Sequence, residues 1–70
     1  MEHGLRLVHF AVNGEDIRKS GIEKILLGLD GIEYVDYISE DNVVYISFDS
    51  DLISIDSILE IFRKNNINIK

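Results

Sequence analysis

Two stretches of this chain repeat the same spacing of apolar residues, and that repeat constrains the fold more than any other feature. The two patterns are Ile22-x-x-Ile25-Leu26-x-x-Leu29 and Ile55-x-x-Ile58-Leu59-x-x-Phe62. Apolar residues at i, i+3, i+4 and i+7 lie along one side of an α-helix. The repeat therefore predicts two amphipathic helices, each with an apolar stripe that must face a core.

The residues at the ends of both stretches suit helix termini. The first helix is expected over about 14–29, after Asn13 as its N-cap. Gly31 follows it and can adopt the left-handed conformation that closes a helix before a strand begins. The second helix is expected to begin after Ser54, which can cap it, and to end at Asn65.

Four further segments are rich in β-branched and aromatic residues, which favour strands. They cover residues 5–12, 32–37, 43–49 and 67–70. The polar run Glu40-Asp41-Asn42 is typical of a hairpin turn and would join the second strand to the third.

The predicted order is strand, helix, strand, strand, helix, strand, which is a repeated split βαβ unit. Right-handed crossovers place both helices on one face of a four-stranded antiparallel sheet and leave the other face open. The sequence therefore predicts an α+β fold, a ferredoxin-like βαββαβ sandwich, formed by residues 1–70 as a single domain.

Composition excludes several classes of protein. The 70 residues include no cysteine, so the core must stabilise the fold without disulfides, and we expect a cytoplasmic protein in a reducing environment. The net charge of -6 would repel phosphate backbones and argues against nucleic-acid binding. No apolar run approaches the ~20 residues that a membrane span needs. The first residues also lack the basic region of a signal peptide.

The sequence shows no pattern typical of an active site. Ser20, Ser39 and Ser57 have no histidine at a spacing that would suggest a nucleophile and its base. Glu40 and Asp41 fit a solvated turn better than an acid–base pair. No glycine-rich phosphate loop is present either. We therefore expect a protein that is not an enzyme and has no bound cofactor.

Two long segments resemble a known family. IEKILLGLDGIEYV and FDSDLISIDSILEIFRKNNINI are similar to the corresponding parts of heavy-metal-associated domains, and the resemblance runs from about Val8 to Ile69. Those domains are small copper-chaperone-like modules that also occur at the amino end of metal-pumping P-type ATPases. The resemblance implies a ferredoxin-like fold and an association with metal transport.

The residues that bind metal in that family are replaced here. The family uses a Met-x-Cys-x-x-Cys loop before the first helix, and Asn13 stands at the methionine while Glu15 and Arg18 stand at the cysteines. Soft copper(I) selects sulfur, whereas these two side chains offer one hard oxygen and one permanent positive charge. No metal-binding residue therefore carries over. At a spacing of i, i+3 the Glu15 and Arg18 side chains are expected to pair with each other instead.

The open face of the predicted sheet is unusually apolar. Alternation along the first three strands predicts seven residues there: Leu7, His9, Ala11, Tyr34, Ile38, Val43 and Tyr45. Contiguous apolar patches on small domains tend to mark partner surfaces, and tyrosine is common at interfaces. We interpret this face as an interface for a protein partner or a second copy of the chain. The alternative is a set of exposed apolar residues with no binding role.

Three functional hypotheses follow. The leading one is a cysteine-free relative of the heavy-metal-associated domain that acts by protein contact, either by self-association or as a regulatory part of a transporter. The second is a small-ligand sensor of the kind that ferredoxin-like folds also provide. The third is weak zinc or nickel binding, because imidazole and carboxylate suit these ions; its residues would be His3, His9, Glu15 and Asp16.

Overall fold

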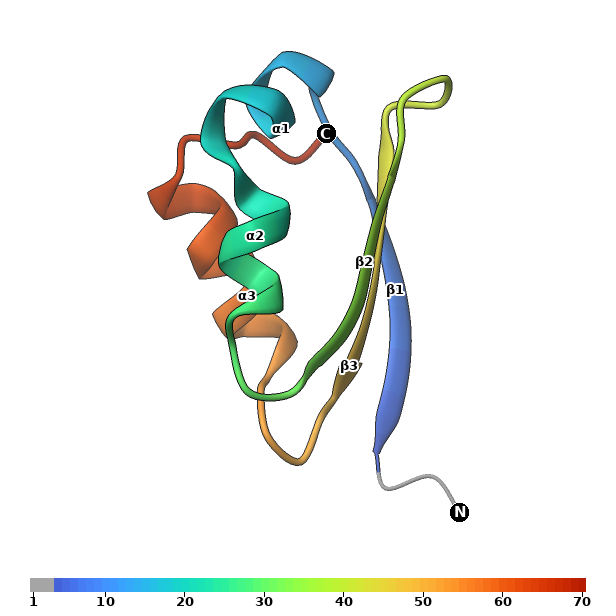
Figure 1. The fold of residues 1–70 in the computed structure, drawn as a ribbon, viewed down its shortest axis with the longest axis vertical. Coiled ribbons are helices and arrows are strands. Elements are labelled where there is room, and N and C mark those ends of the chain that lie inside the picture. Colours follow the sequence, from blue (N-terminus) through green and yellow to red (C-terminus); the bar gives the residue numbers. More distant parts are fainter. Residues whose placement is uncertain (1–3) are drawn as a thin grey trace.

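The computed structural model describes residues 4–70, and within them three helices lie on one side of a three-stranded sheet (Figure 1). In chain order the elements are β1 (Leu5–Ala11), α1 (Gly14–Ser20), α2 (Ile22–Leu27), β2 (Ile32–Ile38), β3 (Val43–Asp49) and α3 (Ile55–Lys64). This confirms the predicted α+β class with helices on one face, and it is compatible with a ferredoxin-like fold. None of the helices formed by residues 4–70 is long and apolar enough to cross a membrane.

The sheet has the order β1-β3-β2, with both pairs antiparallel and β3 in the centre. The prediction of a fourth strand is wrong for the part of the chain that the structure describes. Residues 67–70 contribute one isolated bridge, from Val12 to Ile69, and one hydrogen bond, from the Lys70 N–H to the Ala11 carbonyl at 2.9 Å.

The way α3 ends explains why the fourth strand is reduced to a bridge. Asn66 has a left-handed φ of 62°, and its N–H donates to the Arg63 carbonyl at 3.0 Å. The Ile67 N–H donates to the Phe62 carbonyl, also at 3.0 Å. These two bonds form a Schellman motif, which turns Ile67 inward so that its side chain joins the core. The chain therefore reaches β1 only at Ile69.

The first predicted helix is divided into two. Gly21 has a left-handed φ of 64° and separates α1 from α2, which ends at Leu27 rather than at residue 29. Ile17 and Ile22 are both buried, although residues five apart do not share a face of an uninterrupted helix. The turn at Gly21 brings both side chains onto the core, and this is why the single-helix prediction is wrong.

Among residues 4–70 the core contains eleven buried apolar residues, which come from every element except β1, from the residue that follows β1 and from the C-terminal segment. They are Val12, Ile17, Ile22, Leu26, Ile32, Val44, Ile46, Phe48, Ile58, Phe62 and Ile67. Each predicted stripe supplies two of them one turn apart, whereas Ile25 and Ile55 are exposed. Phe10 and Phe62 meet edge to face with ring centroids 5.8 Å apart and join β1 to α3.

The two predicted N-caps and the left-handed conformation of Gly31 are confirmed, but Gly31 does not close the helix, because α2 ends at Leu27 with Gly28 as its C-cap. The Asn13 Oδ1 accepts the Glu15 N–H at 2.8 Å, and the Ser54 hydroxyl accepts the Ser57 N–H at 3.1 Å. Gly31 has a φ of 99° and lies against the loop between β3 and α3. Its carbonyl accepts the Asp49 N–H at 2.7 Å.

Candidate functional site

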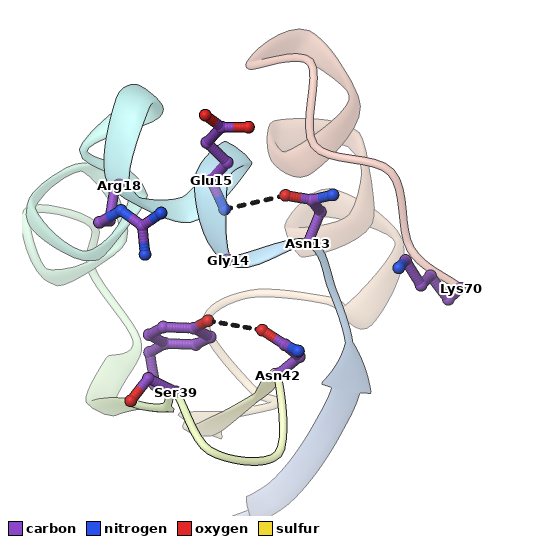
Figure 2. A pocket seen from close by; sticks show the side chains of 8 residues that line it. Asn13, Gly14, Glu15, Arg18, Ser39, Asn42 and Lys70 are labelled. Carbon is purple, nitrogen blue, oxygen red and sulfur yellow. Dashed lines mark hydrogen bonds between the residues drawn. The ribbon is translucent and has the colours of Figure 1, made fainter.

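The loop between β1 and α1 lines an open pocket of about 330 Å³, at the place that the family resemblance assigns to metal (Figure 2). The α1 end of the pocket is formed by Asn13, Gly14, Glu15 and Arg18. The hairpin between β2 and β3 and the C-terminal segment complete it with Tyr37, Ser39, Asn42 and Lys70.

A close contact between this loop and the hairpin shapes the pocket. The Tyr37 hydroxyl donates to the Asn42 Oδ1 at 2.9 Å, a bond that Figure 2 marks. The Tyr37 hydroxyl oxygen lies so near Gly14 that a Cβ added to this glycine would overlap it. Glycine at position 14 therefore allows the tyrosine to pack beneath the first turn of α1. The Asn13 side chain is occupied in capping that turn.

The donor chemistry of this pocket does not suit copper(I). Its side chains offer amide, hydroxyl and carboxylate oxygens, together with the cations of Arg18 and Lys70. Copper(I) selects sulfur ligands and would be repelled by these cations. Within residues 4–70 no three histidine, cysteine, aspartate or glutamate side chains form a group that could hold a metal ion.

The expected pairing of Glu15 with Arg18 is wrong. The one salt bridge among residues 4–70 joins Arg63 to Glu60 on α3. Figure 2 shows the Glu15 carboxylate and the Arg18 guanidinium directed away from each other. Both residues are exposed, and a surface pair gains too little free energy to hold two long side chains in one geometry.

The residues of the zinc or nickel hypothesis are spread over separate parts of the molecule. His9 lies in the middle of β1 and packs beside Tyr45 of β3. Glu15 and Asp16 lie in the first turn of α1. His3 lies outside the described residues.

The sheet face opposite the helices carries all seven residues that alternation placed there. Strand register arranges them in three rows, which are Leu7-Ser47-Tyr34, His9-Tyr45-Asp36 and Ala11-Val43-Ile38. We call these seven residues, Leu7, His9, Ala11, Tyr34, Ile38, Val43 and Tyr45, the open-face patch. Leu7 is 66% exposed, Tyr34 51% and Tyr45 37%. At its centre the His9 and Tyr45 rings are tilted with centroids 5.5 Å apart.

A bulge in β2 sets which residues reach this face. The register shifts between Ile32 and Tyr34, so that Ile32 lies opposite Phe48 in the core and Tyr34 opposite Ser47 on the open face. Strict alternation would have put Ile32 and Tyr34 on one face. Sequence reasoning therefore missed the burial of Ile32. It also left out Asp36, which shares the parity of Tyr34 and could have been found by it.

Asp36 changes the ionisation of its neighbour. The Tyr34 hydroxyl donates to the Asp36 Oδ2 at 3.0 Å. This hydrogen bond raises the pKa of Tyr34, because the phenolate form can no longer donate; slight desolvation and the negative charge of Asp36 add to the shift. The bond thus holds the exposed Tyr34 side chain along β2, next to Asp36 at the margin of the open-face patch.

Removal of this bond is expected to lower the pKa of Tyr34 toward its ordinary value of about 10. In the Asp36→Ala variant, NMR titration of the Tyr34 ring carbon Cζ should show ionisation at lower pH than in the parent chain. Because the folded-state pKa is raised, the bond stabilises the fold below the ordinary pKa and is lost as pH rises through the raised one. Asp41→Ala is the control, and equal Tyr34 titrations in the parent and Asp36→Ala chains would contradict the assignment.

Comparisons with known proteins show a shared fold. No family model matches the chain, and no curated protein sequence matches it at a significant level. The solution structure of a candidate copper-ion-binding protein from Bacillus anthracis strain Ames superposes with a TM-score of 0.80. That likeness covers 99% of this chain and 100% of the other at 16% sequence identity. The two chains therefore share their fold over nearly their whole lengths.

Proposed function

We propose that this chain is a non-enzymatic domain of the ferredoxin-like, heavy-metal-associated type that has no metal ligands in its loop and acts by protein contact in the cytoplasm. Its partner at the open-face patch is a second copy of the chain. The likeness to a candidate copper-ion-binding protein supports the domain type. Asn13, Glu15 and Arg18 in the loop support a role other than carrying copper(I).

The observation that carries the proposal is the exposure of Leu7, Tyr34 and Tyr45 within one patch of a small chain. Large contiguous apolar patches are uncommon on monomeric proteins and mark interaction sites. Tyrosine combines a large apolar ring with a polar tip, which makes it a frequent interface residue.

The charges around the patch favour a second copy as its partner. Among the outward-facing residues of the three strands there is no lysine or arginine. The carboxylates lie at the margins: Asp36 and the exposed bulge residue Glu33 on the peripheral strand β2, and Asp49 at the last residue of β3. A two-fold contact between two such centres would bury no charged side chain at its middle, where an unpaired charge is costly.

Sedimentation equilibrium tests this proposal. We expect the parent chain to form a dimer, and sodium chloride to strengthen it by screening the charge of -6 on each copy. Tyr45→Glu should raise the dissociation constant about 100-fold or more, because each interface would bury two carboxylates. Leu27→Glu is the matched control: it makes the same charge change at an exposed residue of α2 and should leave the dimer intact.

Three outcomes would overturn the proposal. A parent chain that stays monomeric at the highest usable concentration has no self-contact, and a dimer that survives Tyr45→Glu does not use this face. A dimer that forms only with added zinc and is lost in His9→Ala would replace protein contact with metal binding.

A further inference from the structure

The outer edge of β1 presents backbone groups that point away from the sheet. The Val12 N–H donates to the Asn42 carbonyl at 2.9 Å, and the Gly4 carbonyl accepts the Ser50 N–H at 2.8 Å. Since hydrogen-bonded residues alternate in an antiparallel pair, the even-numbered residues of β1 bond to β3. The odd-numbered residues Leu5, Leu7 and His9 therefore direct their N–H and carbonyl groups outward.

One further strand position is already occupied at this edge. Ile69 bridges to Val12 in the antiparallel sense, and the Lys70 N–H bonds to the outward carbonyl of Ala11. Within residues 4–70 no strand continues along positions 5–10 on that side. The bridge thus defines the direction and register in which an added strand would run.

An apolar cavity accompanies this edge. Its volume is about 410 Å³, and its lining is Arg6, Leu7, Val8, Phe48, Ser50, Ser54 and Ile55. Leu7 belongs to the open face and Val8 to the core face, so a cavity lined by both extends around the outer edge of β1. Val8 is only half-buried, and Ile55 at the start of α3 is exposed. The core layer is therefore incompletely covered here.

We propose that this edge binds an extended segment of a partner protein, which adds to the sheet as a strand antiparallel to β1. Main-chain bonds to Leu5, Leu7 and His9 would supply affinity, and the cavity would select side chains at alternate positions. In the direction that the Val12–Ile69 bridge sets, the segment passes Phe10, Val8 and Arg6 in that order from its amino end. Residues that lie directly opposite each other point their side chains to the same face of the sheet. The site uses the outward backbone groups of Leu7 and His9, whereas the open-face dimer proposed above uses their side chains.

The lining determines the sequence of the segment. Positions opposite Phe10 and Val8 meet apolar surface and take apolar side chains. Arg6 forms no ion pair with residues 4–70, so the position opposite it takes a carboxylate. The pattern is apolar-x-apolar-x-acidic, read from the amino end.

A second copy of β1 fits this edge poorly. Two copies of β1 could pair antiparallel only if the outward N–H and carbonyl groups of their odd-numbered residues face each other. In every such alignment along residues 5–10, Arg6 of the second copy lies opposite Arg6, Val8 or Phe10. Its guanidinium would then face a like charge or enter the apolar side of the edge, and both are unfavourable. The outer edge of β2 is blocked differently, because the bulge after Ile32 interrupts its ladder there.

The probe for this site is the peptide acetyl-Thr-Ile-Thr-Val-Thr-Glu-Thr-amide, followed by NMR on the ¹⁵N-labelled chain. We expect saturable binding and slower hydrogen exchange at the amides of Leu5, Leu7 and His9, with little change at Val8 and Phe10. The control peptide has proline in place of the threonine between valine and glutamate, which lies opposite Leu7, and should bind at least ~10-fold more weakly, because proline cannot donate to the Leu7 carbonyl.

Variants separate backbone pairing from side-chain contact. Leu7→Pro removes an outward N–H and leaves the β1–β3 ladder in place, so it should weaken peptide binding at least ~10-fold. Leu7→Ala keeps the N–H and should bind more tightly than Leu7→Pro. His9→Pro repeats the test at a second outward amide. Tyr45→Glu should bind the peptide as the parent chain does, which distinguishes this site from the open-face patch.

Several results would overturn the inference. The first is the absence of saturable peptide binding, and the second is equal binding of the proline control peptide. The third is slower hydrogen exchange at Val8 and Phe10 as much as at Leu5, Leu7 and His9. Protection of the same odd amides in the protein alone, rising with its concentration, would assign the edge to a second copy instead.

Discussion

Leu26→Ala is expected to destabilise the domain by roughly 2 to 5 kcal/mol, because the truncation leaves a cavity beneath a fully buried side chain. A loss of that size is a large share of the ~5 to 15 kcal/mol that stabilises a typical domain. Urea unfolding followed by circular dichroism measures it. Leu27→Ala is the neighbouring control: Leu27 is 53% exposed and its truncation should change stability by about 0.5 kcal/mol or less. Equal losses in the two variants would show that α2 packs in another rotation.

Gly31→Ala should cost roughly 2 to 5 kcal/mol, since it combines an unfavourable backbone conformation with overpacking. Its φ is 99°, and an added Cβ would lie 2.9 Å from both the Leu52 Cβ and the Ile53 Cγ2. The same unfolding measurement applies.

Gly21→Ala isolates the backbone part of that effect. Gly21 is also left-handed, with φ 64°, but a Cβ there meets nothing within 4 Å. We expect a cost of about 1 to 2 kcal/mol from conformation alone. If Gly31→Ala costs no more than Gly21→Ala, the packing of Gly31 against the loop before α3 is not what restricts this position.

The open-face patch shows how far alternation carries a prediction. The structure places all seven residues on the face where alternation put them, because side chains in a paired strand point to opposite sides in turn. Tyr34 alternates in step with Ile38 because the bulge, with its extra residue, lies before Tyr34 in β2 and not between the two. Ile32, on the other side of the bulge, is buried, although uninterrupted alternation would put it on the same face as Tyr34.

The pocket beside α1 was located by resemblance, but its contents follow from packing. Asn13, Glu15 and Arg18 could be placed in it from the sequence. Tyr37 reaches it because Gly14 leaves room for the hydroxyl, a contact between residues far apart in the chain. No local pattern announces such a contact.

The sequence by itself determined the features that depend on near neighbours along the chain. These are the strand alternation, the caps at Asn13 and Ser54, and the stripe residues one turn apart in each helix. Each depends on a period or a hydrogen bond that spans only a few residues.

Only the tertiary structure decided the break at Gly21, the reduction of the fourth strand to one bridge, and the cavity at the outer edge of β1. Ile17 and Ile67 are buried because the core accepts them, and the backbone turns at Gly21 and Asn66 to bring them there. The cavity joins β1 to the end of β3 and the start of α3. Packing of distant segments outweighs local preference at these places, because burial of apolar side chains contributes more free energy than an uninterrupted helix or one more strand residue.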